Sequence, residues 1–253
     1  MKILIDKYLE SYKKKLTNFE KKIDNFYKKS KNLDFEYLTQ TSSVFSSNIE
    51  WNMLDINSFM NLKMSKNITK EVEEIENLID SYNFAMKNKL NEKNFLKIHK
   101  ISSKTLLIDS KRWIYRDDSV WVFWKHWLIY LAIEPKYVKE KMKELFEDIN
   151  HLLNINLSKK EVFYWASFVH LKFVHIHPFS DWNGRCARIL EKWFICEKLG
   201  EEFWKLRSEE FYKENLWKYY KNINLWVNYY ELNYDNCVDF LMMLIESLKI
   251  YDE

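Results

Sequence analysis

Apolar positions recur at helical spacing along most of this chain, and that pattern indicates its fold class. Between residues 3 and 30, apolar side chains stand mostly three or four positions apart, as on one face of an α-helix. The same spacing predicts further helices over residues 68–87, 91–101, 136–154, 159–175, 184–199, 208–222 and 235–250. Asn67 and Ser158 precede two of these segments and are expected to cap them. The sequence therefore predicts a mostly α-helical protein.

One segment departs from the helical period. Residues 116–131, RDDSVWVFWKHWLIYL, contain two short β-rich runs, 120–123 and 128–131. We expect a β-hairpin here, although its turn carries Trp124 and Trp127 where such turns usually have glycine. No repeat, low-complexity tract or Pro/Ser-rich linker divides the sequence. The expected architecture is a single, mostly α-helical domain with one hairpin.

Composition and charge narrow the classes of partner. The 253 residues are 47% hydrophobic, enough to bury a substantial core, and 40 basic residues nearly balance 37 acidic ones. This balance gives no case for nucleic acid or a membrane as partner. The three cysteines follow no metal-binding spacing and suit core packing in a reducing compartment. With no apolar stretch of signal-peptide or membrane-span length, we expect a cytoplasmic protein.

The stretch HPFSDWNGRCAR, residues 177–188, concentrates the candidate chemistry. One predicted helix ends just before it and another begins within it, and the free N–H groups and dipole of a helix start favour an anion. Arg185 and Arg188, three positions apart, can both reach a polyphosphate from the first turn. Asp181 offers the hard oxygen that Mg²⁺ requires, and His177 suits a general base near neutral pH.

These residues resemble the motif of Fic-domain proteins, His-Pro-Phe-x-Asp/Glu-Gly-Asn-Gly-Arg-x-x-Arg, and differ from it only at Trp182. WIYRDDSVWV and LIYLAIEP are similar to the flap hairpin of that family and the segment behind it. SSNIEWN, residues 46–52, resembles the inhibitory motif Ser/Thr-x-x-x-Glu-Gly/Asn; Ser46 and Glu50 match, and Trp51 stands where glycine is usual. The motif lies N-terminal to the core. In this it resembles the subclass of Fic proteins that are inhibited by a helix preceding their own Fic core.

The resemblance implies a protein adenylyltransferase, which moves AMP from Mg-ATP to a Ser, Thr or Tyr hydroxyl of a target protein. His177 would take the proton of the attacking hydroxyl, and Asp181 would hold Mg²⁺ against the phosphates. The nucleotide would also meet the backbone amides of Trp182, Asn183 and Gly184, the side chains of Arg185 and Arg188, and, at the base, Tyr212.

The resemblance also implies regulation and organisation. Glu50, in one motif with Ser46, would inhibit by pairing with Arg188. An extended segment of the target protein would add as a strand at Val120, Trp121 and Val122 in the flap. Residues 1–90 would form an N-terminal helical region that includes the motif 46–52. Residues 91–253 would form the Fic core, with the flap hairpin at 116–131 and the active-site loop at 177–188. A homodimer also fits the resemblance, while the target, the nucleotide and any removal of AMP stay open.

The glycine and tryptophan content raises a separate question. The chain has 2 glycines and 11 tryptophans, whereas about 7% glycine is typical of proteins. Tryptophan stands at 51, 113, 124, 127 and 182, positions where the family or a tight turn calls for glycine. One hypothesis is that the gene's UGA codons encode glycine and were translated as tryptophan; the other is a lineage that carries these tryptophans. If Trp182 obstructs the phosphate site, the alternative function is a catalytically impaired binding module.

Overall fold

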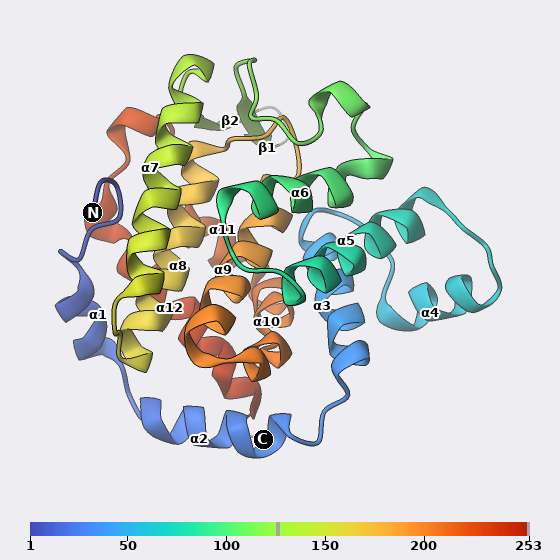
Figure 1. The fold of residues 1–253 in the computed structure, drawn as a ribbon, viewed down its shortest axis with the longest axis horizontal. Helices are drawn as coiled ribbons and strands as arrows, with labels where there is room; N and C mark the ends of the chain where they lie inside the picture. The colour runs from blue at the N-terminus through green and yellow to red at the C-terminus, as the bar shows by residue number, and fades with distance from the viewer. Residues whose placement is uncertain (125–126, 252–253) are drawn as a thin grey trace.

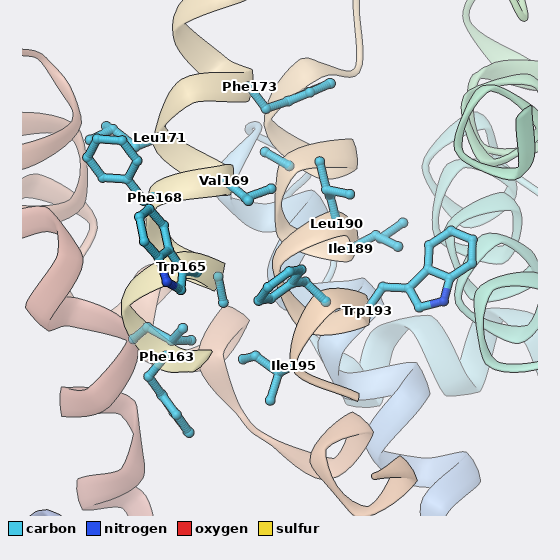
Figure 2. Close-up of a cluster of buried hydrophobic side chains, with 14 of the residues drawn as sticks. Phe163, Trp165, Phe168, Val169, Leu171, Phe173, Ile189, Leu190, Trp193 and Ile195 are labelled. Carbon is cyan, nitrogen blue, oxygen red and sulfur yellow. The ribbon is translucent and has the colours of Figure 1, made fainter. Parts of the chain in front are cut away.

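Two long helices joined by the 177–182 loop organise the computed structural model, which describes residues 1–124 and 127–251. They are α8 (Lys159–Ile176) and α9 (Asn183–Leu199). The short connection returns α9 alongside α8, and buried side chains such as Val169, Phe173 and Leu190 pack around the contact (Figure 2). Both helices are buried on nearly every face because further helices surround them. The loop between them is thereby fixed at one end of a dense core.

The other elements follow the chain around this pair (Figure 1). The remaining helices and the two strands are α1 (Leu9–Lys15), α2 (Phe19–Ser30), α3 (Phe35–Ile49), α4 (Ile56–Met64), α5 (Lys70–Met86), α6 (Glu92–Ser102), β1 (Trp121–Trp124), β2 (Trp127–Leu131), α7 (Pro135–Asn154), α10 (Ser208–Glu214), α11 (Leu216–Ile223) and α12 (Val238–Glu246). Short 3₁₀ turns connect several of them. The mostly α-helical fold with one hairpin is as the sequence predicted.

One apolar core runs through both regions expected from the sequence. Tyr12 and Phe26, from α1 and α2, are fully buried in the same cluster as α8 and α9. Residues 1–90 and 91–253 therefore share one hydrophobic core. A smaller core, centred on Phe59 and Val72, joins α3, α4 and α5 at the edge of the molecule (Figure 1).

Several boundaries differ from the predicted ones for local reasons. The helix expected over 3–30 breaks into α1 and α2, where Asn18 adopts a left-handed backbone with φ 53°. The segment 208–222 likewise divides at Asn215. The predicted cap at Ser158 is confirmed as a capping box with Glu161, but Thr69 caps α5 in place of Asn67. The apolar spacing predicted neither α3 nor α4, because serine, threonine and asparagine are frequent there.

The hairpin lies within one residue of its predicted strands. β1 and β2 pair antiparallel, with Trp121 opposite Leu131 and Val122 opposite Tyr130. Residues 125–126 of its turn, between the tryptophans at 124 and 127 where glycine is expected, lie outside the described residues. The three cysteines are free and buried, as predicted. Within residues 1–124 and 127–251, no helix combines the length and apolar character needed to span a membrane.

Three of the tryptophans in question have the backbone conformation of glycine. Trp51, Trp113 and Trp182 have φ values of 71°, 70° and 72°. For residues with a Cβ, this left-handed conformation costs roughly 1–2 kcal/mol, and glycine avoids the cost. Of the other two, Trp124 is the last residue of β1 and Trp127 is the first residue of β2. The backbone at 51, 113 and 182 therefore agrees with the glycine hypothesis, which codons can decide: UGG at 51 and 182 would end it.

Replacing Trp51 by glycine should stabilise the protein. Its side chain is 62% exposed, so little burial is lost, and relief of the left-handed backbone should raise the free energy of unfolding by about 0.5–1 kcal/mol. The control is Trp217→Gly, an exposed tryptophan within helix α11, which should lower that free energy by roughly 0.5–1 kcal/mol. Urea denaturation measures both; equal destabilisation would show that the φ at 51 carries no penalty.

Candidate active site

His177 ends helix α8 and faces the loop that follows. It is the C-cap residue, with a left-handed backbone (φ 51°, ψ 58°), and its N–H donates to the Phe173 carbonyl at 3.0 Å. Its Nδ1 lies 3.3 Å from the Val174 carbonyl oxygen. Because a carbonyl only accepts, Nδ1 carries the hydrogen and Nε2 keeps a free lone pair. Burial lowers the pKa of His177 to about 4, so the ring is neutral at pH 7 and able to accept a proton.

The loop is held in shape by a buried aromatic ring and an amide. Phe179 is completely buried and stacks on the His99 ring with centroids 3.7 Å apart. Its N–H donates to Asn183 Oδ1 at 2.9 Å, and Asn183 Nδ2 donates back to its carbonyl at 2.8 Å. The Asn183 side chain thus closes the loop onto the start of α9. The sequence predicts a nucleotide contact for the backbone amide of Asn183, but it does not indicate this role of the Asn183 side chain or the stacking of His99.

Arg116 joins the base of the hairpin to the loop. Its backbone N–H donates to the Pro178 carbonyl at 2.8 Å, and its Nε donates to the His177 carbonyl at 2.7 Å. An Nη2 hydrogen reaches the Ile133 carbonyl behind β2 at 2.5 Å. The sequence marked this residue only as the start of the hairpin segment. Its buried guanidinium sets where the hairpin stands relative to His177.

Most of the predicted site residues meet at one cavity of about 320 Å³. It is lined by Glu50, Val120, Trp121, Val122, His177, Ser180, Asp181, Trp182, Asn183, Gly184 and Arg185. Thus the hairpin, the loop, the start of α9 and the end of α3 all border it. The Asp181 side chain is half exposed here. Asp181 and Glu50 are the carboxylates among the lining residues, and within the described part of the chain no group of three or more His, Cys, Asp or Glu side chains could hold a metal ion.

Arg188 is completely buried and fully engaged by the end of α3. Its Nε donates to Ser46 Oγ, and its Nη2 donates to the Ser46 carbonyl and to Glu50 Oε1, each at 2.9 Å. Burial alone would raise the pKa of Glu50, but the Arg188 and Arg185 charges lower it below the usual value. A Cβ at Gly184 would overlap the Glu50 carboxylate, so glycine allows this approach. In this state Arg188 is not open to a phosphate.

The C-terminal end of α3 is anchored by two residues that the sequence did not single out. Lys213 Nζ donates to the Asn48 carbonyl at 2.8 Å, and the Tyr220 hydroxyl donates to the Ile49 carbonyl at 2.9 Å. These bonds satisfy carbonyls that a helix end leaves open. They hold Glu50 over the cavity, and no motif in the sequence signals them.

Arg185 is also occupied. One Nη1 hydrogen bonds the Glu74 carboxylate of α5, and Nη2 lies 3.4 Å from Asp181 Oδ1. Its guanidinium stacks on the Trp182 indole, 3.8 Å from the ring centre. The indole is 1% exposed, so the tryptophan is packed into the protein beside the arginine.

Tyr212 lies elsewhere. Its ring is buried in the core, its hydroxyl lies 3.0 Å from Glu191 Oε2, and it is not among the cavity-lining residues. The structure thus places Tyr212 in the core and away from the cavity at which the resemblance implies a contact with the base. Sequence alone could not show this, because the helix that carries Tyr212 could face either way.

Part of this sequence is similar to known proteins of the Fic/DOC family. The model of the Fic/DOC family matches residues 89–195. A protein adenylyltransferase, fic-1 of Caenorhabditis elegans, is 34% identical over 61 residues, which are 24% of this chain and 11% of that protein. The chain thus spans about a tenth of the length of this curated relative.

Solved structures share the fold over nearly the whole chain. A Fic family protein from Desulfovibrio desulfuricans G20 is 18% identical, with a TM-score of 0.78 over 98% of this chain and 75% of that one. A Fic-domain signalling protein from Bacteroides thetaiotaomicron is 16% identical, with a TM-score of 0.68 over 93% and 96%. Fic-1 of C. elegans is 17% identical, with a TM-score of 0.68 over 96% and 71%. Residues 89–195 thus match the Fic/DOC family, and the chain shares the fold of these Fic proteins over nearly its whole length.

Proposed function

We propose that this protein is an adenylyltransferase that moves AMP from Mg-ATP to a Ser, Thr or Tyr hydroxyl of a target protein. The observation that carries the proposal is the cavity shared by His177, Asp181 and the N-terminus of α9, with the hairpin along its side. A neutral base, a carboxylate and helix amides together suit attack on a phosphate ester. The short match to the worm protein adenylyltransferase supports the same reaction class.

In the proposed reaction, the hydroxyl oxygen of the target bonds to the α-phosphorus of ATP. The bond between that phosphorus and the α–β bridging oxygen breaks, and pyrophosphate leaves. His177 Nε2 takes the hydroxyl proton, since Nδ1 is committed to the Val174 carbonyl. The backbone amides of residues 182–184 and the charge of Arg185 and Arg188 stabilise the phosphates. Mg²⁺, when bound with ATP at Asp181, would neutralise phosphate charge.

The target would add to the outer edge of β1. At β2, Leu131 N–H donates to the Val227 carbonyl at 2.6 Å, and Leu131 bridges to Asn228, so the end of that edge is covered. In the two-stranded sheet of the described residues, β1 pairs only with β2, and its start lines the cavity beside His177. An added strand would satisfy the open backbone groups and bring its hydroxyl to the cavity.

The contact between Glu50 and Arg188 would inhibit the enzyme. With Arg188 held by Glu50 and Ser46, the terminal phosphate of ATP lacks its arginine, and ATP would bind in a pose that does not react. The impaired-module alternative rests on Trp182. It is not favoured, because the backbone at 182 keeps the left-handed turn and the indole lies buried beside Arg185.

Replacing His177 by alanine should abolish transfer and leave Mg-ATP binding nearly unchanged. The imidazole acts on the attacking hydroxyl, and loss of a general base costs about 10²–10⁴-fold in rate. Labelled ATP, incubated with cell lysate or with the protein alone, reports transfer, and calorimetry reports binding. His151→Ala, on the exposed side of α7, is the control. Transfer by the His177→Ala protein at the original rate would rule out the mechanism.

Replacing Glu50 by glycine should raise transfer about tenfold, the lower end expected for losing a charge-assisted hydrogen bond worth roughly 1.5–3 kcal/mol. The gain stays at the lower end because Ser46 still holds Arg188 through two bonds. Glu36→Gly, an exposed change in the first turn of the same helix, should give no gain. Labelling of the protein itself measures the effect. Equal labelling of the Glu50→Gly and Glu36→Gly proteins would contradict autoinhibition.

Glycine at 51, 113, 124, 127 and 182 should improve binding of Mg-ATP. At 182 the change removes the indole from Arg185 and lets the backbone turn approach a phosphate without strain. We expect the affinity for Mg-ATP to rise about tenfold, because Arg185 no longer has to leave a cation–π contact and the backbone strain at 182 is relieved. Trp217→Gly serves as the control for loss of a tryptophan. Unchanged affinity in the five-site protein would show that Trp182 is compatible with the phosphate site.

A further inference from the structure

Glu74 is a buried carboxylate that the proposed reaction does not use. It lies on α5 and is 9% exposed, whereas its neighbours Glu71 and Glu73 are exposed. A buried carboxylate is costly unless a cation or hydrogen-bond donors compensate it. Its burial in a run of solvated acidic residues therefore points to a specific partner.

That partner is Arg185, a proposed phosphate ligand. Arg185 Nη1 bonds Glu74 Oε1, and the two side chains are only 7% and 11% exposed. The other oxygen of Glu74 accepts from Asn52 Nδ2 at 3.4 Å. With the Trp182 indole against one face of the guanidinium, Arg185 is enclosed from two sides. Arg185 also lines the cavity, so a polyphosphate bound there must compete with the Glu74 carboxylate for this guanidinium.

Asn52 connects Glu74 to the turn that carries Glu50. It follows Glu50 by two residues, and its Nδ2 also donates to the Glu71 carbonyl at 3.1 Å. The turn after α3 is therefore bonded to the first turn of α5. Glu50 and Glu74 approach α9 from these two joined elements and take two arginines that stand three residues apart.

We infer that Glu74 is a second inhibitory carboxylate, which withholds Arg185 from the phosphates while Glu50 withholds Arg188. This inference rests on the proposed use of both arginines for phosphate binding. It makes inhibition a property of α3, its following turn and α5 together. Removing Glu50 alone leaves Arg185 occupied, so full access requires that both carboxylates withdraw.

The test is the affinity of the whole chain for Mg²⁺ with inorganic triphosphate, and in parallel for Mg-ATP, by titration calorimetry. Glu74→Gln should bind both about tenfold tighter, because the neutral amide competes less well for Arg185. Glu73→Gln, the same change on the exposed face of α5, should bind like the original protein. Glu50→Gln/Glu74→Gln should bind triphosphate more tightly than either single variant, since each carboxylate holds a different arginine.

A shorter acid provides a second variant in case the amide unfolds the protein. Glu74→Asp keeps the charge but draws it back from Arg185, and should tighten triphosphate binding by a smaller factor. If neither folded variant binds triphosphate more tightly than Glu73→Gln, the inference is overturned. Tighter triphosphate binding without adenylyl transfer in any variant would support Glu74 as an inhibitory carboxylate and refute the proposed reaction. If Glu50→Gly raises transfer but neither Glu74 variant binds triphosphate more tightly, the proposed reaction stands and the inference about Glu74 is overturned.

Discussion

The buried guanidinium of Arg188 is the interaction on which the rest of the site depends. A charge this deep must be compensated, since removing one partner of a buried ion pair costs roughly 3–5 kcal/mol. Ser46 and Glu50 supply that compensation from α3, and the Tyr219 hydroxyl lies 3.3 Å away on the other side. Tyr219 in turn bonds His170, whose Nδ1 lies 3.2 Å from Glu191. Helix α3 is thus joined to a polar network inside the core.

A second constraint places the hairpin. Arg116 bonds the carbonyls of His177 and Pro178 on one side and that of Ile133 on the other, so the loop and the base of the hairpin move as one unit. The fixed distance between β1 and His177 follows from this. The proposed transfer to a hydroxyl on an added strand would require such a fixed distance, because misplacement of the reacting atoms costs rate steeply.

The tryptophans show how a backbone can keep a conformation that its side chains disfavour. Trp51 and Trp182 both sit in left-handed turns next to the site, one exposed and one buried against Arg185. Surrounding structure holds the turns: Asn48 bonds the carbonyls of Asn52 and Leu54, and the amide of Asn183 closes the loop after Trp182. The loop before α9 therefore keeps its conformation with a bulky residue at 182, while the indole fills the space beside Arg185.

The sequence by itself determined the long helices, the hairpin and the grouping of His177, Asp181 and Arg185, because helical period and a contiguous motif are local properties of the chain. It could not determine the core position of Tyr212 or the contacts of Arg116, His99 and Glu74. Each of these depends on contacts between segments far apart, such as Glu74 with Arg185 across 111 positions. The partners that compensate the desolvation of a buried polar side chain are brought to it only by packing. Only the tertiary structure, therefore, decided that both arginines are occupied.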